Sequence, residues 1–169
     1  MRHHVSKVLP YAPDQLFRLV GDVAAYPDFV PWLTSMRTWN ARKLGDGVDA
    51  VDAEAGVGFS FLKERFATRV RRDAHNRQID VSLISGPFRK LENRWRFIDA
   101  GHNCTRIEFD IDFLFKSRLL ETLLRANFSH AVDKLINCFE GRANELYGAP
   151  HANPPPPAAG LGEPVPAAQ

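Results

Sequence analysis

The fold is decided by residues 117–147, which read SRLLETLLRANFSHAVDKLINCFEGRANELY. Apolar residues, from Leu120 through Ala131 to Leu146, recur in this stretch at steps of three and four, the spacing that places side chains on one face of an α-helix. Ser117 can cap the first turn, and Gly148 followed by Pro150 ends the pattern. At ~1.5 Å per residue, a single helix here would be about 45 Å long. The sequence therefore predicts a long C-terminal helix that packs on a broad, curved partner.

Alternating apolar and polar residues upstream predict the strands of this partner. A strand at residues 2–9 precedes two short helices, the first beginning at Pro13 and the second lying within the proline-punctuated stretch 22–32. Six further strands follow one another through tight turns, which is typical of an antiparallel sheet. We expect them near residues 34–43, 48–57, 59–72, 79–83, 91–97 and 107–115. The predicted fold class is α+β, with a curved antiparallel sheet of about seven strands wrapped around the long helix.

The strand expected at residues 59–72 changes phase along its length. Phe59 and Phe61 occupy odd positions, whereas Phe66 and the apolar residues after it occupy even positions. A slip of one residue inside a strand predicts a β-bulge, here near residues 62–65. In the following hairpin, we expect Trp95 to pair with Phe109, because this register keeps the apolar residues of both strands on one face.

Composition sets the domain organisation and excludes some classes of function. We expect one folded domain at residues 1–148, followed at residues 149–169 by a proline-rich tail with too few large apolar side chains to fold. The net charge of +2 argues against a dedicated nucleic-acid-binding protein, and we expect no DNA partner. Cys104 and Cys138 are far apart and fit free thiols in a reducing compartment. Because the N-terminus also lacks the apolar stretch of a signal peptide, we expect a cytoplasmic protein.

Residue patterns for catalysis or metal binding are lacking in the sequence. The six histidines and two cysteines have none of the spacings of a metal site, and no nucleophile elbow or phosphate-binding loop occurs. Glu108, Asp110 and Asp112 alternate along one strand, opposite Arg94 and Arg96 on its neighbour, which predicts a solvated ladder of ion pairs. We therefore expect neither an enzyme nor a metal cofactor.

Inward-facing aromatic residues are the main functional signal. They can form an ordinary core or line a pocket for an apolar ligand, and periodicity does not choose between the two. Asn93 is an amide on the apolar face of its strand. It either bonds the backbone near the predicted bulge or orients the polar head of a ligand.

Two motifs resemble a known family. Residues 22–32, DVAAYPDFVPW, are similar to a signature of the coenzyme Q-binding, START-like proteins. Residues 86–91, GPFRKL, with Trp95 and Phe97 beyond them, resemble a second segment of that family. The resemblance covers about residues 1–147, and Leu33 departs from it where many members carry cysteine.

The resemblance implies a helix-grip fold with an apolar cavity that binds ubiquinone or a similar polyprenyl lipid in support of respiration. For this chain the implied cavity residues are Phe29, Trp32, Phe59, Phe61, Phe66, Trp95, Phe97, Phe113, Phe115, Leu120, Leu124 and Phe128. Asn93 is the implied polar contact. The implied entrance comprises Tyr26, Pro27, Pro31, Gly86, Pro87 and Phe88.

The resemblance also leaves two other functions open, because its bacterial relatives are described as ribosome-association toxins or as polyketide cyclases. A ribosomal partner would use a basic run along one strand, namely Lys63, Arg65, Arg69, Arg71 and Arg72. A cyclase would need an inward-facing acid or base, and we expect no inward Asp, Glu or His. A lipid ligand would also fit a transient contact with the inner membrane, so peripheral attachment there is a further expectation.

Overall fold

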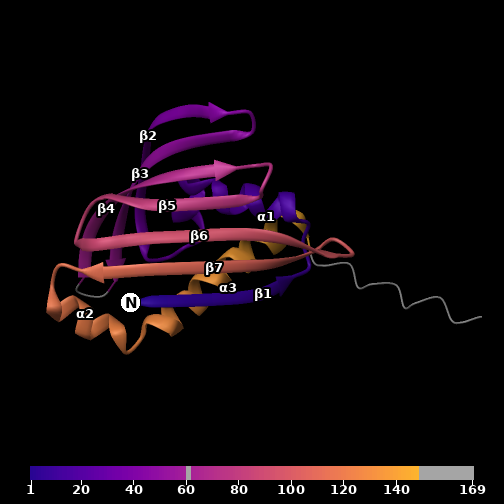
Figure 1. Ribbon diagram of the computed structural model, residues 1–169. Helices are drawn as coiled ribbons and strands as arrows, with labels where there is room; N and C mark the ends of the chain where they lie inside the picture. The colour runs from indigo at the N-terminus through magenta and orange to yellow at the C-terminus, as the bar shows by residue number, and fades with distance from the viewer. Residues whose placement is uncertain (60–61, 149–169) are drawn as a thin grey trace, which may run out of the picture.

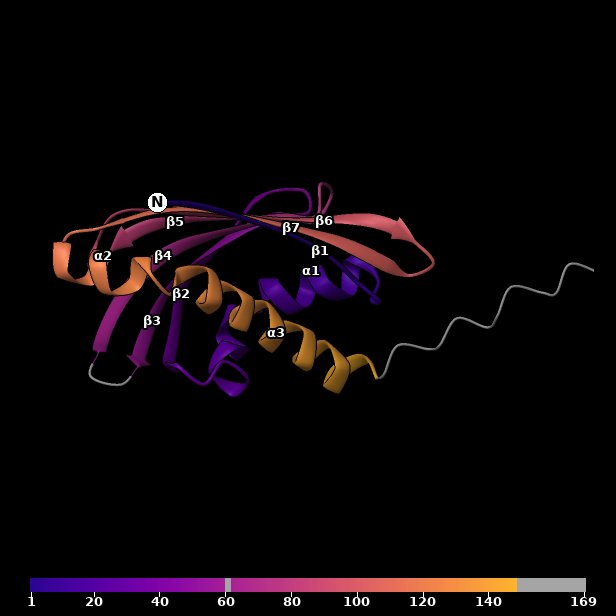
Figure 2. The same cartoon turned by 90° about the horizontal axis from the view of Figure 1, so that it is seen from below.

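The computed structural model describes residues 1–59 and 62–148, except the side chains of Phe59 and Leu62. Seven strands form one antiparallel sheet in the order β1-β7-β6-β5-β4-β3-β2. Helices α1 and α3 cover one face of this curved sheet, and α2 lies at its end (Figures 1 and 2). The strands are β1 (Arg2–Leu9), β2 (Leu33–Gly45), β3 (Val48–Phe59), β4 (Leu62–Asp73), β5 (Gln78–Ser85), β6 (Phe88–Gly101) and β7 (Cys104–Phe115). The helices are α1 (Pro13–Gly21), the 3-10 helix η1 (Val23–Asp28), α2 (Arg118–Arg125) and α3 (Phe128–Tyr147).

The predicted helix-grip architecture is confirmed, including the register of the last hairpin. Trp95 of β6 pairs with Phe109 of β7, and Arg94 pairs with Asp110. This register keeps alternate residues of both strands on the concave face of the sheet, where the helices lie.

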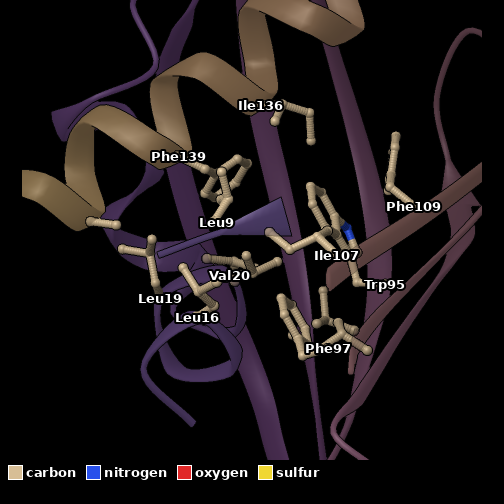
Figure 3. Packing of buried hydrophobic residues seen from close by; sticks show 14 of the residues in the cluster. Leu9, Leu16, Leu19, Val20, Trp95, Phe97, Ile107, Phe109, Ile136 and Phe139 are labelled. Atoms are coloured by element: carbon tan, nitrogen blue, oxygen red, sulfur yellow. The ribbon is translucent and has the colours of Figure 1, made fainter. Parts of the chain in front are cut away.

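The main core lies between α1, α3 and the centre of the sheet. Phe139 of α3 packs its ring against Trp95, with ring centroids 5.4 Å apart, and Ile136 points the same way (Figure 3). The buried face of α3 consists of Val132, Ile136, Phe139 and Ala143. Ala131 and Leu146, predicted on the buried face, are exposed.

The prediction of one continuous C-terminal helix is wrong, because the chain bends between α2 and α3. Asn127 leaves the helical conformation with φ −118° and ψ 7°, and α3 starts beyond it. Ser117 caps α2 as predicted, accepting a hydrogen bond from the Leu120 amide at 3.4 Å. The bend lets α3 cross the main core while α2 follows the end of the sheet (Figure 2), two surfaces that one straight helix could not contact together.

The predicted bulge near residues 62–65 is also wrong. The phase change marks the end of one strand and the start of the next, since β3 ends at Phe59, β4 begins at Leu62, and these two residues pair. A hairpin reverses the chain, so the apolar positions resume on the other parity without any slip inside a strand. An irregularity does occur farther along, between Ala67 and Thr68, where β4 pairs with β5.

Candidate ligand-binding site

The concave face of the sheet carries two separate apolar clusters. The first is the main core around Trp95 and Phe139. The other, called here the second cluster, lies at the α2 end of the sheet. Its buried members are Leu91, Phe113 and Phe115, and its partly buried members are Met1, Phe66, Leu83, Phe88, Ile111, Leu120, Leu124 and Phe128. Ile111 contacts both clusters, so the boundary between them runs along its position in the sheet.

A row of half-buried residues crosses the sheet at this boundary. Strand pairing places His3 beside Ile111, Ile111 beside Asn93, and Asn93 beside Val81. Each of these side chains lies on the concave side, because the residues before and after it on its strand belong to the charged outer face. The row has the mixed character of a ligand site, with aliphatic side chains on either side of one amide.

The amide of Asn93 is the unusual group in this row. Its Oδ1 is buried and has no hydrogen-bond partner among the described residues. A buried acceptor without a partner costs about 1–3 kcal/mol, so proteins keep one only where something else offsets the cost. The sequence left open whether Asn93 bonds the backbone or a ligand. Among the described residues, its Oδ1 has no backbone bond.

Three of the predicted cavity residues, together with Tyr26 from the predicted entrance, belong to the main core alone, and a fourth, Phe128, contacts both clusters. Trp95 and Phe97 are buried there, and Phe29 and Tyr26 place their rings 5.4 Å and 5.1 Å from that of Phe139. The Tyr26 hydroxyl donates a hydrogen bond to the Val20 carbonyl, and burial raises the pKa of this phenol. These contacts fasten the Tyr-Pro segment of η1 to α1 and α3.

The second cluster gathers the predicted residues of β4, β6, β7 and α2. Phe113 lies 4.3 Å from Phe128 between ring centroids, and it also packs edge-on against Phe115 at 5.4 Å. Leu120 and Leu124 contact this cluster from α2. Phe61 and the side chain of Phe59, also predicted here, lie outside the described residues.

The turn between β5 and β6 explains the Gly-Pro-Phe motif. Gly86 has φ +143°, and a Cβ there would lie 2.5 Å from the Cβ of Phe66, so the turn crosses Phe66 at a distance that only glycine allows. Phe88 then stacks on Phe115 at 4.7 Å and meets Phe66 edge-on at 5.5 Å. The Pro87 carbonyl accepts a hydrogen bond from the Lys116 amide, which ties this turn to the start of α2.

The remaining predicted entrance residues, Pro27 and Pro31, and the predicted cavity residue Trp32 come from the segment that leads into β2. Pro27 lies within η1, Pro31 is exposed, and Trp32 is half-buried. The Trp32 carbonyl accepts a hydrogen bond from the Gly58 amide, so this segment meets the end of β3. The motif at residues 22–32 and the Gly-Pro-Phe motif therefore both lie near the α2 end of the sheet, where β3 ends and β4 and β6 begin.

Histidine on the concave face was missed by the sequence reasoning, which expected no inward acid or base. His3 places its ring edge-on to Phe128, with centroids 5.8 Å apart. The alternation of β1 contained the signal, because His3 shares the parity of Val5. Among the described residues, no group of three or more His, Cys, Asp or Glu side chains could hold a metal ion.

The basic run of β4 is divided by the alternation of the strand and largely paired with aspartates. Arg69 donates a hydrogen bond to Asp52 at 3.1 Å, and the bonds from Arg69 and Asn40 hold the pKa of this carboxyl below its usual range. Arg72 points to the other side, binding Asp49 at 2.7 Å and the Gly21 carbonyl at 2.9 Å. The run is therefore not one continuous basic surface.

The outer face of the sheet forms an ion-pair ladder, but only part of it uses the predicted partners. Arg96 bonds Asp110 at 3.4 Å as predicted, whereas Arg94 bonds Asp80 of β5 at 2.6 Å, and His4 of β1 contacts Asp110 at 2.6 Å. A shallow hollow of about 930 Å³ lies among these charges. Another, of about 660 Å³, lies between α1 and the β2–β3 hairpin and is rimmed by Arg18, Lys43 and Arg72. Neither hollow is lined by the aromatic residues of the second cluster.

Comparison with known proteins adds evidence of descent. Residues 9–140 match the family described as "Polyketide cyclase / dehydrase and lipid transport". A ribosome association toxin RatA from Rickettsia prowazekii is 35% identical over 144 residues, covering 83% of this chain and 94% of the toxin. The coenzyme Q-binding protein COQ10 homolog B from Xenopus laevis is 30% identical over 85% of this chain and 58% of its own length. The solution structure of the 18 kDa protein CC1736 from Caulobacter crescentus is 64% identical, with a TM-score of 0.75 over 88% of this chain and 99% of that protein.

Proposed function

Because the chain belongs to the polyketide cyclase / dehydrase and lipid transport family, we propose that it is a non-enzymatic protein that holds ubiquinone or a similar polyprenyl lipid. The ligand lies on the concave face, with its tail against the second cluster and its ring beside Asn93. Binding of this kind would supply or buffer quinone for respiratory electron transport. The name of the Xenopus relative, a coenzyme Q-binding protein, supports this choice of ligand.

The observation that carries the proposal is the unpartnered amide oxygen of Asn93 between two apolar clusters. A side-chain amide both donates and accepts hydrogen bonds. It can therefore donate to the carbonyl of a quinone or accept from the hydroxyl of the reduced quinol. The apolar tail needs only shape and apolar surface, at about 0.8 kcal/mol per buried methylene before ordering costs.

Replacement of Asn93 by leucine separates a ligand contact from a structural one. Asn93→Leu removes an unpartnered buried polar group, so the free energy of unfolding should stay within about 1 kcal/mol of the wild type or rise. Affinity for decylubiquinol, the reduced short-chain analogue whose hydroxyl can donate to Asn93 Oδ1, should fall about tenfold in titration calorimetry, since that hydrogen bond is lost. Asn137→Leu, on the exposed side of α3, is the matched control and should change neither quantity.

Two results would contradict the proposal. One is a wild-type protein that carries no quinone in lipid extracts analysed by mass spectrometry and does not bind the analogue. The other is an Asn93→Leu protein that loses stability but binds the analogue normally, because the amide would then serve the fold alone.

Association with a ribosomal subunit is the second candidate function. It is favoured by the name of the Rickettsia relative, of which this chain spans 94%. Arg69, Arg71 and Arg72 of the predicted run are paired with aspartates, so Lys63 and Arg65, exposed at the α2 end of β4, are its members best placed for phosphate contacts. Co-sedimentation with ribosomal subunits, weakened by salt, is the direct measurement.

A further inference from the structure

Helix α2 carries more apolar surface than the protein covers. Leu120 and Leu124 contact the second cluster, yet no residue of α2 is fully buried. On the adjacent side of the helix, Leu119 and Leu123 are 69% and 44% exposed. They are four residues apart and so form one continuous apolar strip. An amphipathic helix whose own protein covers only half of its apolar face is suited to bind another apolar surface.

Cations surround this strip. Three segments meet at the α2 end of the sheet, namely residues 63–65, 86–90 and 116–125, as strand pairing and the bond from Lys116 to Pro87 require. Together they contain seven Lys or Arg and two Glu, a net charge of +5. The whole chain carries +2, so the remainder carries −3. Lys90 forms an ion pair with Asp112, and Arg125 forms one with Glu121. The other five cations are exposed, namely Lys63, Arg65, Arg89, Lys116 and Arg118.

We propose that this end of the molecule docks on an anionic lipid membrane, with α2 lying in the interface. Leu119 and Leu123 enter the boundary between headgroups and acyl chains, while Lys116, Arg118 and their neighbours contact lipid phosphates. Ile84 and Leu114, 43% and 38% exposed at the same end of the outer sheet face, extend the apolar contact. None of the described helices is long and apolar enough to cross a bilayer.

A membrane fits this surface better than RNA does. Both partners attract the cations, but aliphatic side chains gain nothing from phosphates, and proteins read RNA bases by stacking aromatic rings or guanidinium groups on them. The exposed apolar residues of α2 are leucines. The docking also does not depend on the proposed quinone ligand, because Leu119 and Leu123 are not members of the second cluster.

Vesicle flotation tests the docking directly. Wild-type protein should float with vesicles of phosphatidylglycerol and phosphatidylcholine, and hardly at all with phosphatidylcholine alone. Leu119→Ser combined with Leu123→Ser should weaken this binding about tenfold or more, since two inserted leucines are lost. Leu44→Ser with Leu146→Ser, which removes equally exposed leucines elsewhere, should bind like the wild type.

Charge variants complete the test. Lys116→Glu with Arg118→Glu should abolish binding, whereas Lys43→Glu with Lys134→Glu should not. The proposal is overturned if the wild type ignores anionic vesicles, or if the Leu119 and Leu123 variant binds them normally. If the wild type and the leucine variant both bind ribosomal RNA and neither binds vesicles, this end of the molecule is an RNA contact instead. Loss of quinone binding with intact flotation would refute only the proposed function.

Discussion

At the scale of single residues, the Gly-Pro-Phe motif shows what sequence reasoning can and cannot supply. A tight turn was predicted between the strands near 79–83 and 91–97, and the structure has it at Gly86, but spacing could not reveal that the turn crosses Phe66. That approach joins a turn residue to a residue of β4 twenty positions earlier in the chain, and local pattern does not encode it. Asn93, in contrast, could be identified from the sequence as an amide on the apolar face, because alternation along one strand is a local pattern.

Gly86→Ala should therefore destabilise the protein by about 2–4 kcal/mol, because φ +143° is strained for alanine and its Cβ would overlap Phe66. Gly101→Ala is the matched control. It also has a positive φ, +80°, but nothing lies within 4 Å of its Cβ, so about 1 kcal/mol is expected. Urea unfolding of both variants gives the comparison. Equal losses would show that backbone strain, and not the approach to Phe66, is what fixes the glycine.

At the scale of elements, the single C-terminal helix and the bulge near residues 62–65 were predicted wrongly for one reason: local periodicity does not show where the chain changes direction. The apolar stripe continues through Asn127, so periodicity predicts a single helix, whereas in the structure α2 follows the end of the sheet and α3 crosses its concave face. The β3–β4 reversal contains neither glycine nor proline between Phe59 and Leu62, so it resembled a slip within one strand. Strand number, antiparallel order and the pairing of Trp95 with Phe109 were predictable, because each follows from local alternation and turn length.

The separation of α2 from α3 predicts different local stability. Because α2 buries no residue and α3 buries four, amides of α2 should exchange with deuterium about tenfold faster or more in the free protein. Decylubiquinone should slow exchange in α2, whose Leu120 and Leu124 border the second cluster, and leave the C-terminal half of α3 unchanged. Equal protection of both helices in the free protein would show that α2 is a fixed part of the core.

At the scale of the whole molecule, a grip-shaped sheet divides its concave face between a packed core and a second, looser cluster at the α2 end. The aromatic content fitted either a core or a pocket, and alternation could not assign residues to one or the other. Trp95, Phe97 and Phe29 went to the core, while Phe66, Phe88 and Phe113 went to the second cluster. That division depends on where α3 crosses the sheet, which is a tertiary property.

Where the ligand lies is tested most directly by methyl NMR during titration with decylubiquinone. A ligand on the concave face should shift the methyl groups of Leu91, Leu120 and Leu124 in the second cluster. It should also shift those of Val81, which lies beside Asn93. Val8, Leu44 and Leu146, exposed elsewhere on the molecule, should not move. Shifts confined to exposed methyl groups, or none at saturating analogue, would contradict a lipid site on the concave face.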